Sequence, residues 1–268
     1  MKGEVYSGVL LTLALGLPGF LALAVVTGEL SQLIGLSALT LGYFVLAGIL
    51  HFVIGRTLTY ASLQQIGAAR ASPLIGTNTL YTVLLAILLL GEPATPKVLA
   101  AALLVVAGVV LLSRHERPDK EIQLTSKKHG VAYSLLAGFI FGVTPLLVRA
   151  GLLLAPLPAL AAMISYAVAL LLYLIGSFFP SRRKVMTRGT ITSAFLIAAV
   201  SVNLGQILRY YALNLAPASV ASTIINAFPL FALIFAYPRS QGLETYSRAV
   251  LGGAGLILVG ISLLYLAP

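Results

Sequence analysis

The 268-residue chain contains no cysteine. This absence excludes a disulfide framework, a thiolate metal site and a cysteine nucleophile. Charged residues are also scarce, at 9% of the chain against 59% apolar residues. A soluble domain with a solvated surface cannot be built from that composition, so the sequence is that of an integral membrane protein.

Apolar runs of about 20 residues recur along the chain, which is the length that a helix needs to cross a bilayer. Barrel strands would alternate at period two and would be about half as long. We therefore predict an all-α integral membrane protein, with a first run retained as a helix because no small-residue cleavage site follows it. The nine predicted spans are 5–27, 38–63, 72–90, 96–113, 129–152, 157–179, 188–213, 218–237 and 248–266.

The chain also repeats itself. The segment 205–230 matches the segment 55–80 without a gap, and the matched pairs include Gly55 with Gly205, Tyr60 with Tyr210 and Ser72 with Ser222. Five predicted spans separate each position from its mate, and an odd number of crossings reverses direction, so we predict an inverted-topology repeat. Residues 1–113 form the first transmembrane repeat, which lacks its first helix. Residues 114–128 form a polar connecting loop and residues 129–268 the second repeat, a 4+5 arrangement.

The net charge of +10 comes from 17 Lys and Arg against 7 Asp and Glu. In a soluble protein this excess would suggest nucleic acid, but here the basic residues cluster in short loops between predicted spans. We therefore expect a lipid bilayer, and no nucleic acid, as partner. The charge count places Arg70, Lys128 and the N-terminus on the cytoplasmic side and the C-terminus outside. The loop 28–37 has no Lys or Arg whereas its repeat mate 178–187 has three, as opposed orientations require.

All seven Asp and Glu residues fall in predicted loops or at span ends. Ion-coupled carriers usually place a carboxylate within the membrane, so we do not expect a carboxylate-based antiport. His51 is the only centrally placed side chain that titrates near neutrality, and it is either a proton relay or a polar residue hydrogen-bonded within the bundle. Paired carboxylates, metal-ligand clusters and catalytic triads are absent from the sequence. We predict no enzyme activity, no metal site and no cofactor.

Two of the arginines within predicted spans lie at nearly matching points of the two repeats. An arginine at mid-membrane costs about 2.5 to 3.5 kcal/mol on insertion scales. Its presence there suggests that it has a functional role or pairs with another polar group. Our hypothesis is that Arg56 and Arg209 flank opposite mouths of a central cavity and attract an anionic or zwitterionic substrate. The alternative is that each reaches the lipid headgroups or caps neighbouring carbonyls.

Further polar and aromatic residues recur at helical spacing around these arginines, and polar groups in hydrocarbon turn toward the bundle interior. For each of them, interhelical hydrogen bonding without substrate contact is the alternative. The complete set of cavity candidates is His51, Arg56, Tyr60, Asn78, Tyr81, Asn203, Gln206, Arg209, Tyr210 and Asn226.

We expect the glycines and prolines of the spans to affect how the helices pack and bend. Gly108 and the glycines of the last span, Gly252, Gly253, Gly255 and Gly260, permit close helix approach, within the monomer or across a homodimer. We expect Pro73, Pro145 and Pro229 to bend their helices near the cavity.

Two phrases resemble a known family. YYALNLAPASVAS followed by Pro229, and SPLIGTNTLYTVLLAILLLGE followed by a glycine-bearing span, are similar to EamA-like members of the drug/metabolite transporter (DMT) superfamily. The resemblance implies ten helices in a 5+5 inverted repeat, alternating access, and export or exchange of a small metabolite. The chain departs from the family in lacking the first helix, and in having Gly242-Leu243-Glu244 where the first half has Leu90-Gly91-Glu92. Family members generally have both termini in the cytoplasm, which conflicts with the charge count.

These observations favour a secondary transporter, a multi-pass protein of the cell membrane that moves a small organic metabolite by alternating access. One alternative is a non-transporting membrane sensor or assembly subunit of the same fold. Another is a membrane-embedded enzyme that acts on a lipid-linked substrate, although the sequence offers no catalytic set for it.

Overall fold

The computed structural model describes residues 2–93, 95–113, 127–177, 193–227 and 248–265. The described chain is helical and contains no strand, which confirms the all-α prediction. Six of the described helical segments are long and apolar enough to cross a membrane, and two shorter apolar helices cover 96–112 and 251–264. Large apolar side chains such as Val26, Ile34 and Leu215 are more than four-fifths exposed. Side chains of this kind suit contact with lipid tails and would be costly in water.

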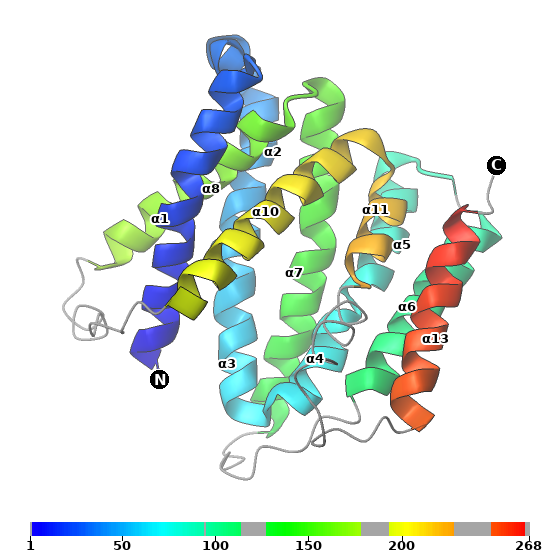
Figure 1. Ribbon diagram of the computed structural model, residues 1–268. Helices are drawn as coiled ribbons and strands as arrows, with labels where there is room; N and C mark the ends of the chain where they lie inside the picture. Colours follow the sequence, from blue (N-terminus) through cyan, green and yellow to red (C-terminus); the bar gives the residue numbers. More distant parts are fainter. Residues whose placement is uncertain (1, 94, 114–126, 178–192, 228–247, 266–268) are drawn as a thin grey trace. The chain divides into compact units, whose positions relative to one another are not determined.

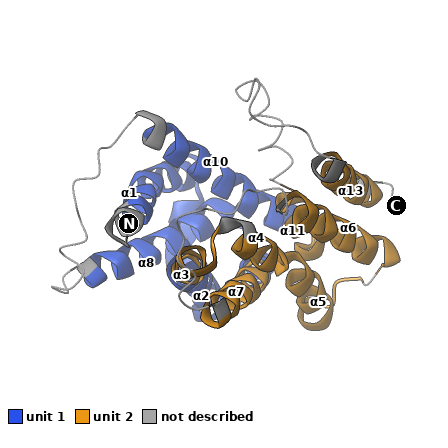
Figure 2. Cartoon of the chain, turned by 90° about the horizontal axis from the view of Figure 1, so that it is seen from below, with its two compact units in different colours: residues 1–54, 147–215 blue, residues 55–146, 216–268 orange. Residues whose placement is uncertain are grey.

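The chain divides into two compact units, and each takes segments from both sequence halves. Unit 1 comprises residues 1–54 and 147–215, and unit 2 comprises residues 55–146 and 216–268 (Figure 2). The units consist of helices that contact each other in space, whereas the predicted repeats are continuous stretches of the sequence. The repeat boundaries remain a prediction.

Unit 1 is built around α8, which packs on α1, α2, α10 and η1. Ser37 starts α2, because its Oγ accepts the backbone N–H of Thr40 at 3.1 Å and so satisfies a donor that the first turn leaves free. Gly48 and Gly151 permit close packing, since a Cβ at either position would overlap Ser165 or Phe44. The elements are α1 (Lys2–Val26), η1 (Glu29–Gly35), α2 (Ala38–Gly48), the π-helix η2 (Ile49–Gly55) up to residue 54, the end of α7, α8 (Pro158–Ser177) and α10 (Ser193–Leu215).

Unit 2 contains two closely packed helix pairs, α6 with α13 and α5 with α11 (Figure 1). Gly108 and Gly253 face each other, and a Cβ on either would lie 2.6 or 2.8 Å from the other's carbonyl oxygen. The predicted close approach of these glycines therefore occurs within the chain. The elements are α3 (Arg56–Ile66), α4 (Ala68–Gly76), α5 (Asn78–Leu90), α6 (Pro96–Ser113), α7 (Lys127–Leu154) up to residue 146, α11 (Ala218–Ile225) and α13 (Arg248–Tyr265).

Two predicted spans are less regular than expected. The span 38–63 is helical to Ile66 but contains the π-helix η2 in its middle. The span 72–90 begins earlier, at Ala68, and is interrupted at Thr77, where α4 ends and α5 begins. Pro73 lies inside α4, and Thr77 Oγ1 donates to the Leu74 carbonyl at 2.7 Å, which satisfies an acceptor at the interruption.

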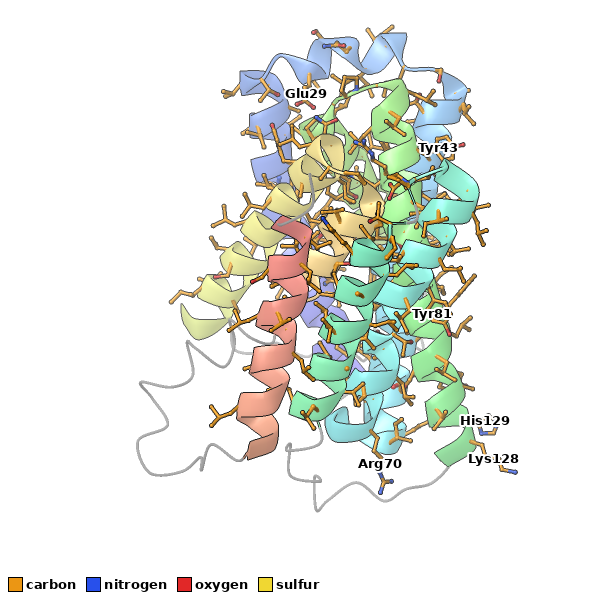
Figure 3. All side chains as sticks on the ribbon, turned by 90° about the vertical axis from the view of Figure 1, so that its right-hand side faces the viewer. Glu29, Tyr43, Arg70, Tyr81, Lys128 and His129 are labelled. Carbon is orange, nitrogen blue, oxygen red and sulfur yellow. The ribbon has the colours of Figure 1, made fainter. Side chains whose placement is uncertain are left out.

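Within the described residues, the other predicted spans match helices and differ from them only at the ends. The predicted helix bend at Pro229 and the second half of the span 218–237 lie outside the described residues. Arg70 and Lys128 lie at the same end of unit 2, as the charge count expects (Figure 3). Which membrane side this end faces remains a prediction.

Candidate functional site

Five of the ten cavity candidates belong to each unit, so the two sets are described separately. Unit 1 holds His51, Asn203, Gln206, Arg209 and Tyr210, and unit 2 holds Arg56, Tyr60, Asn78, Tyr81 and Asn226.

Among the unit 1 candidates, Arg209 of α10 contacts His51 of η2. Nη1 of Arg209 lies 3.2 Å from Nδ1 and 3.1 Å from Nε2 of His51. A nitrogen almost equidistant from both ring nitrogens lies over the face of the imidazole, because in the ring plane it would overlap Cε1. The contact is therefore a cation stacked on a ring rather than one in-line hydrogen bond. Arg209 is only 9% exposed, so this charge is buried within the protein.

The π-helix sets the direction of the His51 side chain. Residues 49–55 form a π-helix, whose i→i+5 bonds give more residues per turn than the 3.6 of an α-helix, so side-chain directions across this segment do not follow α-helical spacing. π-Helical turns are frequent at functional sites, and this one carries His51 against Arg209.

Gln206 lies one turn before Arg209 on α10. Its Oε1 is buried and has no hydrogen-bond partner among the described residues. Side chains three residues apart share a helix face, so an unpaired acceptor and a buried cation lie near each other on α10. A buried acceptor without a partner costs free energy unless a donor reaches it, and a bound solute could supply that donor.

Asn203 of α10 joins three helices. Asn203 accepts a hydrogen bond from the Tyr166 hydroxyl at 3.0 Å and donates from Nδ2 to the Thr12 carbonyl at 3.2 Å. Its amide thus ties α10 to α8 and α1. Tyr210 is almost fully buried. For Asn203 the structure favours the alternative of interhelical bonding.

In unit 2 the two asparagines are brought together. Asn78 begins α5 and Asn226 ends α11, and Asn78 Nδ2 donates to Asn226 Oδ1 at 3.2 Å. Asn226 Nδ2 also donates to the carbonyl of Ser222 at 2.8 Å. Ser222 is 3% exposed, and its Oγ has no partner among the described residues. The pair links the ends of two helices and leaves an unpaired hydroxyl one turn away.

The other candidates of unit 2 are less informative. The ring of Tyr81 meets that of Phe139 edge-on, with centroids 5.6 Å apart, so Tyr81 packs against α7. Arg56 starts α3 and Tyr60 lies one turn later, and both side chains are partly buried. Arg56 and Arg209 belong to different units.

Sequence reasoning missed Glu92, which follows α5. Gly91 ends that helix in a left-handed conformation (φ 66°), and the N–H of Glu92 returns to the Ala86 carbonyl at 3.2 Å. The Glu92 carboxylate then accepts the backbone N–H of Ala218 at 2.6 Å and of Ser219 at 3.0 Å, and the Ser219 hydroxyl at 2.5 Å. The Leu90-Gly91-Glu92 motif thus caps the start of α11. The start of a helix at Pro217-Ala218-Ser219 could be predicted from the sequence. Its capping partner Glu92 could not, because it lies more than 120 residues earlier.

Two further charges cap helix ends within unit 1. Glu29, only 8% exposed, accepts the N–H of Leu160 in the first turn of α8 at 2.9 Å. Arg149 Nη1 donates to the carbonyls of Leu213 and Asn214 at the end of α10, at 3.0 and 2.8 Å. Glu29 was expected only as one of the acidic residues in loops or at span ends. Each of the two charges has the sign that stabilises its helix end.

No group of three His, Cys, Asp or Glu residues that could hold a metal ion occurs in the described part of the chain.

Comparison with known proteins adds the family and the fold. A solved structure, titled only "Crystal structure of protein", aligns with 97% of this chain and 86% of its own at a TM-score of 0.75 and 17% identity. That likeness shows the fold alone. No curated protein matches the chain. The model of the EamA-like transporter family matches residues 2–114 and 128–266, nearly the whole chain. The chain is therefore a multi-pass membrane protein that belongs to the EamA-like transporter family of the DMT superfamily, a family of transporters rather than enzymes.

Proposed function

We propose that the protein is a secondary transporter of the cell membrane that moves a small anionic or zwitterionic organic metabolite by alternating access. The observation that carries the substrate class is Arg209, a buried guanidinium in an apolar helix bundle. Ionisable residues inside membrane spans are costly and by default indicate a functional site. Membership of the family supports transport as the activity, and the positive charge of Arg209 supports a negatively charged group on the solute.

Gln206 supports the same substrate class. A guanidinium binds a carboxylate or phosphate, while the unpaired Oε1 of Gln206 needs an N–H or O–H donor. A solute that carries both an anionic group and a donor, such as an amino acid or a hydroxy acid, would satisfy both residues. A purely apolar solute would satisfy neither.

The test is uptake into proteoliposomes by counterflow, with a panel of anionic, zwitterionic, neutral and cationic metabolites. We expect at least one anionic or zwitterionic solute to accumulate. Arg209→Gln should weaken its uptake by about ten- to a hundredfold, because a hydrogen bond to a charged group contributes about 1.5 to 3 kcal/mol. Arg209→Lys should retain part of the uptake, since it keeps the charge but not the fork of donors.

The matched control is Arg70→Gln, which removes an exposed arginine at the end of unit 2 and should leave uptake unchanged. Accumulation of only neutral or cationic solutes, or equal uptake by Arg209→Gln and wild type, would refute the anionic substrate class. If solutes bind but none crosses the membrane, the non-transporting sensor or assembly subunit becomes the better reading.

A further inference from the structure

The chain passes between its two compact units three times, at residues 54/55, 146/147 and 215/216 (Figure 2). Each passage coincides with an irregularity of the helical backbone. The first falls in the π-helix η2, and the second directly follows Pro145 inside α7. The third lies at Ala216 and Pro217, between the end of α10 and the start of α11. Proline removes a helical hydrogen bond and a π-helical turn widens the ladder, so these are places where a helix bends readily.

The third passage is held on both sides by opposite charges. Arg149 binds the last carbonyls of α10 within unit 1. Glu92 binds the first amides of α11 within unit 2. Each charge opposes the partial charge of the helix end that it contacts, and charge-assisted hydrogen bonds are the stronger ones. Each unit therefore fixes its own side of the passage, and the residues left between the two contacts are Leu215 to Pro217.

We infer that Glu92 and Arg149 are positioning residues for the conformational change of the carrier. They fix α11 to unit 2 and α10 to unit 1, so that movement between the units is concentrated at Ala216–Pro217, with bending at η2 and Pro145. The inference rests on the proposed function for its purpose, since a transporter that alternates access must move one part against another. Its structural content can be measured without any solute.

The absence of native cysteine allows spin labels to be placed at chosen cysteines without a background signal. Ile197 in unit 1 and Leu88 in unit 2 are 67% exposed, and labels there report the distance between the units. A pair at Leu88 and Val259 reports within unit 2. Distance distributions are recorded by double electron–electron resonance in nanodiscs. We expect wild type to show more than one distance between units and one distance within unit 2.

Glu92→Gln removes the charge that holds α11, so the distribution between the units should broaden while the within-unit distance stays sharp. The matched control is Glu29→Gln, which weakens a carboxylate cap that lies wholly within unit 1 and should leave both distributions unchanged. Pro217→Ala should have the opposite effect, because alanine lets α10 and α11 join into one helix and should reduce the distances between units to one. Ser219→Ala, which loses only the hydroxyl bond to Glu92, should broaden the distribution to a smaller extent and serves if Glu92→Gln does not fold.

The inference is overturned if wild type shows a single distance between the units, if Pro217→Ala leaves several, or if both glutamate variants broaden the distribution equally. Broadening of the within-unit distance would likewise overturn it, because Glu92 would then be a general stabiliser of unit 2. These readings are independent of uptake. A sharp effect of Glu92→Gln in a protein that moves no solute would leave the inference standing and refute the proposed function alone.

Discussion

Arg209 in unit 1 brings a full charge into an apolar helix bundle and stacks it on His51, whereas the polar pair of unit 2, Asn78 and Asn226, consists of neutral amides. Both sets leave an acceptor or hydroxyl unpaired, Gln206 Oε1 in unit 1 and Ser222 Oγ in unit 2. The difference is one of charge, because the unit 1 contact holds a guanidinium and the unit 2 contact holds two amides.

The units also differ in how α7 and α10 pack. In unit 2, α7 presents Gly138 and Gly142 to the interruption between α4 and α5, and a Cβ on either would lie close to backbone atoms there. In unit 1, Gly205 of α10 has nothing near its Cβ position. Small residues let membrane helices approach closely, so the helix interruption of unit 2 is held by tight packing.

Among these variants, substitution of the tightly packed Gly142 in unit 2 should have the largest effect on stability. A Cβ at Gly142 would lie 2.5 Å from the Cβ of Tyr81 and 3.0 Å from the Asn78 carbonyl oxygen, so Gly142→Ala forces α7 away from α5. We expect a loss of about 1 to 3 kcal/mol in the free energy of unfolding, the usual cost of overpacking. Unfolding by sodium dodecyl sulfate, followed by circular dichroism, measures it.

Gly205→Ala in unit 1 is the control. Nothing lies within 4 Å of its Cβ position, and alanine favours a helix by about 0.5 to 1 kcal/mol over glycine. This variant should be as stable as wild type or slightly more so. Equal losses for the two variants would mean that the close approach of α7 to α5 does not determine the cost.

The next effect concerns the hydrogen bond that joins α5 to α11. Asn78→Ala, Asn226→Ala and the double variant form a thermodynamic cycle, and we expect a coupling of about 0.6 kcal/mol, the average for interhelical bonds in membranes. The corresponding cycle for Tyr166→Phe and Asn203→Ala in unit 1 should give a value of similar size. Zero coupling for the asparagines alone would mean that they do not hold unit 2 together and that their amides are free for a solute.

The sequence was sufficient for those features that depend on local composition. A helix that crosses hydrocarbon needs a run of apolar residues of fixed length, so the spans could be predicted from the runs alone. Polar residues inside such runs are conspicuous for the same reason, which is why Arg209, His51, Asn78 and Asn226 were found. The Arg209–His51 contact shows that such residues gather, but its partners lie 158 residues apart, and only the fold pairs them.

Features that depend on distant partners could not be predicted. Glu92 was dismissed as a loop charge because its partners at Ala218 and Ser219 are more than 120 residues away. The π-helix was missed because residues 49–55 are apolar enough for an ordinary helix, and periodicity arguments assume one period throughout. The contact of Arg149 with the end of α10 likewise joins residues that are 65 positions apart, so the sequence alone did not indicate it.

The last comparison concerns two buried serines, one in each unit, and Ser222→Ala has the smallest expected effect of all these variants. Ser165 in unit 1 donates to the Phe44 carbonyl at 2.8 Å, so Ser165→Ala should cost about 0.5 to 1.5 kcal/mol, the net value of a hydrogen bond. Ser222 in unit 2 has no partner for its Oγ, so Ser222→Ala should leave the free energy of unfolding unchanged or raise it slightly, because no bond is lost and a desolvated hydroxyl is removed. The same detergent titration compares the two variants. If Ser222→Ala costs as much as Ser165→Ala, the hydroxyl already has a partner such as a bound water. If it costs nothing yet reduces the stabilisation by a transported solute, Ser222 contacts that solute, and unit 2 takes part in recognition.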